Sequence, residues 1–223
     1  MLDKTINSVS EAVTGIHDGA TLLLGGFMNM GFPIELLDAL ADTDVRDLTV
    51  VANNPNFGEQ GLTRLMSAGR VRKLMCSFPR LLGSDLIERL TRDGTMELEL
   101  VPQGTLAERV RCAGAGIPGF YTRTAVGTMI AEGKEHREFN GQTYIFEHAI
   151  RGDVAFIKGR RGDRWGNLVY NKATRNFNPV MATAADLTIA QVDEIVENGA
   201  IDPETVITPG IFVNRLVRAG DGP

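Results

Sequence analysis

Residues 18–33 read DGATLLLGGFMNMGFP, and this stretch decides the fold. The continuous apolar run Thr21–Leu24 predicts a short strand that is buried on both faces. The strand ends at Gly25-Gly26, and a loop leads to Pro33, which favours the first turn of a helix because proline lacks an N–H that would be unpaired there anyway. A buried strand that leads through glycines into a helix is typical of an open α/β sheet.

Strand and helix signals alternate along most of the remaining sequence. Strands are predicted at 21–24, 48–52, 71–77, 96–101, 141–146, 154–158, 168–170, 187–192 and 211–213, and helices at 4–16, 33–40, 61–68 and 85–92, the last with Ser84 as N-cap. This order predicts an α/β fold with a central, mostly parallel sheet flanked by helices. Residues 113–147 break the pattern, and we interpret them as a small insertion over one end of the sheet within a single domain, 1–223.

Composition excludes several classes of function. The 223 residues carry a net charge of -5, which provides no basic surface for nucleic acid and opposes binding to an anionic membrane. No run of about 18 apolar residues is present, and the first residues lack the apolar core of a signal peptide, so we expect a cytoplasmic protein. The two cysteines and three histidines show no metal-ligand spacing, and no metal is expected.

The loop after the first strand is the best candidate for a binding site. Ligands of open α/β sheets bind outside the carboxyl ends of the strands, where such loops lie. Glycine permits close approach of a ligand to the backbone, and the next helix offers free N–H groups at its N-terminus. The pattern therefore suits a phosphate-bearing ligand, although tight turns also use glycine for steric reasons alone. It is neither a P-loop nor a GxGxxG fingerprint.

The whole stretch resembles the signature of the family I CoA-transferases. It has the acidic-glycine pair, the apolar triplet, Gly-Gly-Phe, three variable residues and Gly-x-Pro. The resemblance continues through Asn53-Asn54 and through residues 71–80, 101–122, 127–135, 138–158 and the tail, and so covers nearly the full chain. It implies a loop that binds CoA, made of Gly25, Gly26, Phe27, Met28, Asn29, Met30 and Gly31.

The resemblance also implies a division of labour between two subunits. The chain is similar to the A (alpha) type, and the nucleophilic glutamate of the family, which forms an acyl anhydride and then a glutamyl-CoA thioester, is expected in a homologous B (beta) subunit. The expected assembly is A2B2, with CoA as a substrate and no permanently bound cofactor. Glu197-Asn198-Gly199 resembles the surroundings of that nucleophile, but its flanking segments resemble the end of an alpha chain, so we reject Glu197 as catalytic.

Three polar residues are expected to support the reaction. Gln103 resembles a glutamine that faces the active site, where its amide would hold a substrate carboxylate. Asn53 and Asn54 would orient the substrate, or they would cap the turn through local hydrogen bonds. These alternatives stay open at this stage.

Arginines carry the question of the substrate. The segment SFPR, residues 77–80, is more similar to transferases that act on 3-oxoadipate than to those that act on acetoacetate. The hypothesis is that Arg80 or Arg123 binds a second carboxylate, and the alternative is a surface arginine. The expected reaction transfers CoA from succinyl-CoA to a 3-oxoacid. The alternatives are an acetate, butyrate or acetoacetate transferase, and a CoA-binding module without catalysis.

Overall fold

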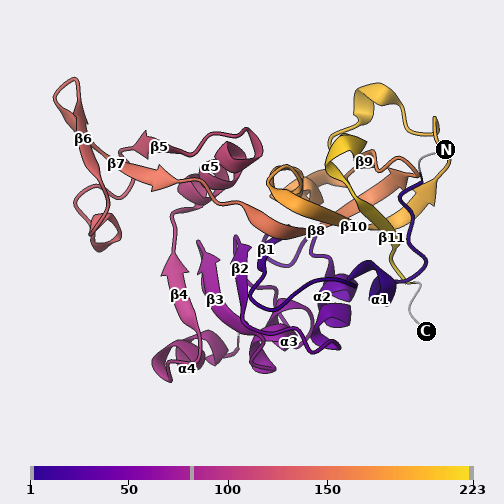
Figure 1. Ribbon diagram of the computed structural model, residues 1–223, viewed down its shortest axis with the longest axis horizontal. Helices are drawn as coiled ribbons and strands as arrows, with labels where there is room; N and C mark the ends of the chain where they lie inside the picture. Colours follow the sequence, from indigo (N-terminus) through magenta and orange to yellow (C-terminus); the bar gives the residue numbers. More distant parts are fainter. Residues whose placement is uncertain (1–2, 81–82, 221–223) are drawn as a thin grey trace.

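The computed structural model describes residues 3–80 and 83–220. Its centre is an eight-stranded sheet with the order β11-β10-β8-β1-β2-β3-β4, and β9 pairs with β8 outside this row (Figure 1). The strands are β1 (Thr21–Leu24), β2 (Leu48–Ala52), β3 (Val71–Cys76), β4 (Glu97–Leu100), β8 (Gly152–Asp163), β9 (Leu168–Val169), β10 (Ala185–Val196) and β11 (Arg215–Arg218). Every pair in the row is parallel, and only β8 and β9 run antiparallel. The predicted α/β class with a mostly parallel sheet is confirmed.

The order of the strands reverses at β1. The chain builds outward from β1 to β4 on one side and then returns at β8 to the other side of β1, where Leu22 pairs with Val154. In open parallel sheets, such a reversal opens a crevice at the carboxyl ends of the two central strands. The loop that follows β1 lies at this position.

Helices cover both faces of the sheet. They are α1 (Val9–Ala12), α2 (Ile34–Ala41), α3 (Leu62–Ser67), α4 (Leu86–Arg92), α5 (Gln103–Gly114) and α6 (Asn178–Ala182), with short 3-10 helices at Met129–Ala131, Lys172–Arg175, Pro203–Thr205 and Gly210–Phe212. Leu22 and Leu24 pack in the core beneath α1 to α4, whereas Leu23 packs in the core beneath α5 and α6. Successive residues of a strand point to opposite faces, so one apolar run serves two cores, and each leucine stabilises the fold by about 1.5–3 kcal/mol.

A smaller antiparallel sheet forms an arm, residues 119–148, that projects from the body beyond β4 (Figure 1). Its strands β5 (Gly119–Thr122), β6 (His136–Phe139) and β7 (Gln142–His148) have the order β5-β7-β6. The turn Asn140-Gly141 joins β6 to β7 with both φ angles positive, 52° and 72°, which is the usual chemistry of a tight hairpin. The predicted insertion is therefore a three-stranded sheet, and the expected strand at 141–146 is confirmed as its central strand.

Charged groups fix the base of the arm to the body. The Glu147 carboxylate is 3% exposed and pairs with Lys134 at 2.6 Å and with Arg109 at 3.8 Å. Arg109, on α5, also donates from Nε to the His148 carbonyl at 2.7 Å and pairs with Glu99 of β4 at 3.1 Å. Lys73 of β3 extends the network to Glu99 at 2.8 Å. A buried carboxylate is costly unless it is paired, so the network constrains how the arm leaves the body.

Several predicted elements are wrong in extent or place. The helix predicted at 4–16 is only the four residues of α1, because the Ile6 N–H donates to the Leu216 carbonyl of β11 and residue 5 bridges to the same strand. The strand predicted at 211–213 is a 3-10 turn, and the last strand is β11. The cap of α4 is Asp85, although the Ser84 hydroxyl accepts from the Leu86 N–H at 3.2 Å. Helix α5 was not predicted.

Candidate active site

The glycine loop, residues 25–33, connects β1 to α2 at the carboxyl edge of the sheet, between the ends of β2 and β8. Its tip is a tight turn in which the N–H groups of Phe27 and Met30 donate to each other's carbonyls at 3.0 and 2.9 Å. Met28 has a φ of 55°, a left-handed conformation that side chains other than glycine, asparagine and aspartate seldom adopt. The surroundings must therefore hold the turn in this shape.

Two glycines of the loop are required by close packing. A Cβ on Gly25 would lie 1.9 Å from the Asn178 Oδ1 atom, and one on Gly26 would lie 2.6 Å from the Phe32 ring. Gly26 also has a φ of 130°, which only glycine adopts without strain. The steric reason for glycine therefore applies at both positions. It leaves the binding role of the loop as a prediction.

Asparagine amides hold the loop from three sides. Asn54, fully buried after β2, accepts from the Met28 N–H at 2.8 Å and donates to the Met28 carbonyl at 2.9 Å. Asn176 accepts from the Gly26 N–H at 3.0 Å and donates to the Met30 carbonyl at 3.1 Å. Buried Asn178 donates to the Gly31 carbonyl at 3.1 Å and accepts from the Lys158 N–H at 2.8 Å, which joins the loop to β8. These amides satisfy backbone groups that would otherwise be buried unpaired.

A second network joins Gln103 to this support. The Gln103 Nε2 group donates to the Asn53 Oδ1 atom at 2.8 Å, and the Ser77 hydroxyl donates to the same oxygen at 2.7 Å. Asn53 in turn donates to the Asn54 Oδ1 atom at 2.8 Å. Gln103 is the first residue of α5, and its side chain is exposed. The structure thus brings Gln103, Asn53 and Asn54 together beside Met28, and the local capping suggested for the asparagines is part of the same arrangement.

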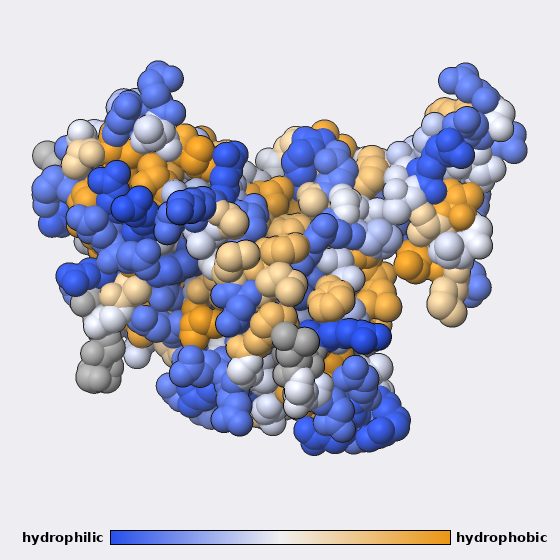
Figure 2. Space-filling model, turned by 180° about the vertical axis from the view of Figure 1, so that it is seen from behind, coloured by the Kyte–Doolittle hydropathy of each residue, from blue (hydrophilic) through white to orange (hydrophobic). Residues whose placement is uncertain are grey.

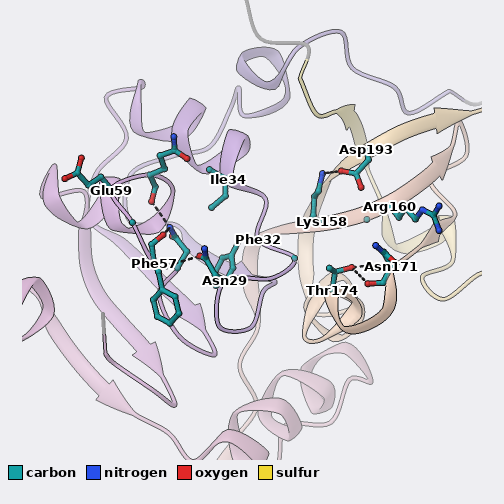
Figure 3. Close-up of a pocket in the computed structure, with 15 residues that line it drawn as sticks. Asn29, Phe32, Ile34, Phe57, Glu59, Lys158, Arg160, Asn171, Thr174 and Asp193 are labelled. Atoms are coloured by element: carbon teal, nitrogen blue, oxygen red, sulfur yellow. Dashed lines mark hydrogen bonds and ion pairs between the residues drawn. The ribbon is translucent and has the colours of Figure 1, made fainter. Parts of the chain in front are cut away.

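Two hollows lie at the glycine loop and share no lining residue. The Gln103 hollow, about 420 Å³, is lined by Phe27, Gln103, Gly104, Ala107, Asn176, Phe177 and Val180. The β8 hollow, about 470 Å³, lies between residues 29–34, the segment 56–60 and β8 (Figure 3). Figure 3 shows Asn29, Phe32 and Ile34 on one side of it and Lys158, Asn171 and Thr174 on the other. Both volumes are in the range of small-molecule sites.

The two candidate arginines lie in different parts of the molecule. Arg80 is exposed and follows β3, close in sequence to Ser77 of the Gln103 network. Arg123 is exposed and follows β5 on the arm, where it lines a hollow with Gly141, Gln142 and Thr143. The structure does not bring the two arginines together.

The remaining nucleophile candidates have other surroundings. The Glu197 carboxylate is 78% exposed and pairs with Arg164 at 3.2 Å. Burial raises the pKa of the Cys76 thiol to about 12, so this cysteine is a neutral core residue at physiological pH. Among residues 3–80 and 83–220, no group of His, Cys, Asp and Glu could hold a metal ion. In the same ranges, no helix has the length and apolar character needed to cross a membrane.

Asn176 and Asn178 are the site residues that sequence reasoning missed. They lie in the run NKATRNFNP, residues 171–179, which contains three asparagines before a proline. Asparagine is common in turns, so the run indicates only a loop. Their partners in the glycine loop are about 150 residues away in sequence, for example Gly26 and Asn176.

Comparisons with known proteins agree in family and fold. The family model described as Coenzyme A transferase matches residues 6–219. The chain is 54% identical over 217 residues to the A chain of 3-oxoadipate CoA-transferase from Pseudomonas putida, covering 97% of this chain and 94% of that one. It is 49% identical to the corresponding chain of a probable succinyl-CoA:3-ketoacid coenzyme A transferase from Bacillus subtilis, covering 97% and 90% of the two chains.

A solved structure supports the same architecture. The glutaconate coenzyme A-transferase of Acidaminococcus fermentans superposes with a TM-score of 0.86 at 19% identity, covering 97% of this chain and 75% of that one. At this identity the likeness concerns the fold alone.

Proposed function

The chain belongs to the coenzyme A transferase family, and on this premise we propose that it is the alpha subunit of an enzyme that moves CoA from succinyl-CoA to 3-oxoadipate. The observation that carries the proposal is the 54% identity, along almost the whole of both chains, to the corresponding chain of a 3-oxoadipate CoA-transferase. The glycine loop, held at the reversal point of the sheet, is consistent with it.

The nucleophilic glutamate would come from the B subunit. Among the described residues that line the Gln103 hollow, none is a carboxylate. Glu197 is exposed and paired with an arginine, and Glu147 is buried between Lys134 and Arg109. A carboxylate that attacks a thioester must reach the acyl carbon, so this hollow needs a nucleophile from another chain. The resemblance to two-subunit members of the family supplies the same expectation.

The chain's own residues would bind and orient the reactants. The loop 25–31 would lie against the CoA thioester, with its shape fixed in advance by Asn54 and the two later asparagines. The Gln103 amide, aligned by Asn53, would donate a hydrogen bond to the carboxylate of the acid without neutralising its charge. Groups that are ordered before binding cost little entropy when the reaction begins.

The second carboxylate of 3-oxoadipate would be bound by Arg80. This arginine follows β3 beside the Gln103 network, whereas Arg123 lies on the arm. A guanidinium can bind a carboxylate through two parallel hydrogen bonds, and a monocarboxylate such as acetoacetate would not use it. The alternative enzyme, acting on acetate, butyrate or acetoacetate, is suggested by the relatives whose names contain 3-ketoacid instead of 3-oxoadipate.

A homologous B subunit is the expected partner, in an A2B2 assembly in the cytoplasm. Apolar side chains gather in the middle of one face of the molecule (Figure 2). Exposed apolar residues at the carboxyl edge include Met28, Met30, Phe78 and Leu100, each between 39% and 47% exposed. Apolar groups gathered on a surface are typical of an interaction site, and the relatives are themselves named as one subunit of their enzymes, which supports the same partner. No permanently bound cofactor is proposed.

The test is a coupled assay of this chain mixed with its B subunit, with succinyl-CoA as donor and 3-oxoadipate and acetoacetate as acceptors. Activity only in the mixture, with 3-oxoadipate preferred, is expected. Preference for acetoacetate or short acids would retain the transferase and replace the substrate. Binding of CoA without activity toward any acid would favour a non-catalytic CoA-binding module.

A further inference from the structure

The glycine loop presents different backbone groups to its two hollows. Near the Gln103 hollow its N–H groups are already used. Gly26 donates to Asn176, Phe27 donates to Met30, and Met28 donates to Asn54. The loop therefore has little hydrogen-bonding capacity left on that side.

The N–H groups beside the β8 hollow are in the opposite condition. Four residues line the hollow and have N–H groups that donate to no residue in the described ranges: Asn29, Gly31, Phe32 and Ile34. Phe32 is only 6% exposed, so its N–H has little access to bulk water. Ile34 is the first residue of the eight-residue helix α2, whose N-terminus adds a positive dipole end. Buried N–H groups in native proteins almost always have a partner, so these donors indicate an acceptor that comes from outside the chain.

A buried amide beneath α2 supports this view independently. Gln191, on β10, is 3% exposed, and its Oε1 atom accepts from the Leu36 N–H at 3.4 Å. Its Nε2 group donates to no residue that the structure describes. Side chains two apart on a strand share a face, so Gln191 lies on the same face of β10 as Asp193, which lines the hollow.

Two cations stand on the β8 side of the hollow. The Lys158 side chain is 18% exposed, and its ammonium pairs with the Asp193 carboxylate, as Figure 3 shows. The Arg160 guanidinium is exposed and points away from the loop in the same view. Asp193 is 59% exposed, so its pair with Lys158 is screened by water and worth at most about 1 kcal/mol. Lys158 can therefore exchange this carboxylate for a stronger anion at small cost, although Glu59 at the rim opposes an anion.

From these donors, and resting on the proposed function, we infer that the β8 hollow binds the phosphate groups of the CoA thioester. The free N–H groups, the Gln191 amide and the two cations are more donors than the two oxygens of a small carboxylate could use. A nucleotide diphosphate offers many acceptor oxygens and suits the N-terminus of a helix. The glycine loop would then separate the phosphates, in the β8 hollow, from the acyl group, in the Gln103 hollow.

The experiment uses the complete complex of both subunits with two donors, succinyl-CoA and succinyl-pantetheine, which has the thioester but no phosphate. The variants are Lys158→Met with Arg160→Gln, which keeps the apolar stem of the lysine, and Asp193→Asn, which removes the competing carboxylate. Arg46→Gln is the matched control, because Arg46 forms an exposed ion pair with Asp18 in the turn that precedes β2.

The double variant should raise the KM for succinyl-CoA roughly tenfold and leave the KM for succinyl-pantetheine and both kcat values nearly unchanged. Asp193→Asn should shift the KM for succinyl-CoA in the opposite direction, which a merely structural role would not produce. Equal losses for both donors, or no change for either, would overturn the inference. Calorimetric binding of CoA and of pantetheine to the same complexes needs no turnover, so the site can fail or succeed separately from the proposed reaction.

Discussion

Asn54 holds the peptide groups on both sides of Met28 at once, because its Oδ1 atom accepts from the Met28 N–H at 2.8 Å while its Nδ2 group donates to the Met28 carbonyl at 2.9 Å. Asn54 is fully buried, and Met28 has a φ of 55°. A buried amide therefore maintains a left-handed turn in a residue that does not favour it. The shape of the glycine loop depends on a side chain that lies outside the loop.

Asn54→Ala should lower kcat of the complex by tenfold or more and destabilise the chain by about 1–3 kcal/mol, because two buried backbone groups lose their partners. Assays of kcat and urea unfolding would measure these effects. Asn140→Ala is the matched control, since Asn140 also has a positive φ, 52°, but lies in the exposed hairpin of the arm. Equal activity losses in the two variants would contradict a specific role for Asn54.

Gln103→Ala should lower kcat/KM for the 3-oxoacid roughly tenfold, and Gln103→Glu should lower it further, because a second carboxylate would repel the substrate. The unfolding free energy should change by less than about 0.5 kcal/mol, since the side chain is exposed. Gln142→Ala, at an exposed position on the arm, is the comparison. Unchanged kinetics in both Gln103 variants would assign the residue to loop structure alone.

Arg80→Ala should raise the KM for 3-oxoadipate and leave the KM for acetoacetate unchanged, because only the dicarboxylate has a second group for the guanidinium. Steady-state kinetics with both acids would test this. Arg123→Ala, on the arm, should change neither value. A similar rise with both acids would count against Arg80 as the residue that distinguishes them.

Cys76 should resist alkylation by iodoacetamide in the native complex and react once the chain is unfolded in urea. Burial raises its pKa to about 12, so the reactive thiolate is scarce below that pH. The unfolded chain loses this proton near pH 8.5, so the contribution of Cys76 to the unfolding free energy should fall as pH rises from about 8.5 toward 12. Rapid labelling of the folded complex at pH 8 would refute the assignment.

Acid should loosen the network at the base of the arm. Burial alone would raise the pKa of Glu99, but hydrogen bonds from Lys73 and Arg109 outweigh this effect and lower the pKa. A lowered pKa means that the stabilisation is present above the ordinary glutamate value, near pH 4.3, and is lost as pH falls through the folded-state value. Glu99→Gln should therefore lose less stability between pH 5 and pH 3 than the unchanged chain. Exposed Glu132→Gln should show no such difference.

The fold could be predicted from the sequence where burial and local pattern agree. The run Leu22–Leu24 is buried on both faces, as its continuous apolar character indicates. Ile211 is 82% exposed, whereas Leu216 and Val217 are fully buried where β11 pairs with β10. An apolar run alone does not show which segment finds a strand partner, and this is why the last strand was misplaced.

The candidate site divides in the same way. The segments Asn53-Asn54 and Gln103 were selected through a family resemblance, and the structure brings them beside the loop while their roles stay predictions. Asn176 and Asn178 were not selected, because an asparagine that supports a distant loop looks like an asparagine in any turn. The free N–H groups at the β8 hollow depend on three-dimensional hydrogen bonding and have no signal in the sequence.

The pairing of β1 with β8 has a consequence for how the protein is made. The centre of the sheet joins residues from the two halves of the chain, such as Leu22 and Val154, and the loop after β1 is held by Asn176 and Asn178. While the ribosome is still synthesising the second half, β1 lacks the neighbour that covers one of its edges. Contacts so distant in sequence form slowly, and exposed strand edges invite aggregation. The first half should therefore depend on chaperones until the second half emerges, and a truncated chain that lacks α6 should have no ordered glycine loop.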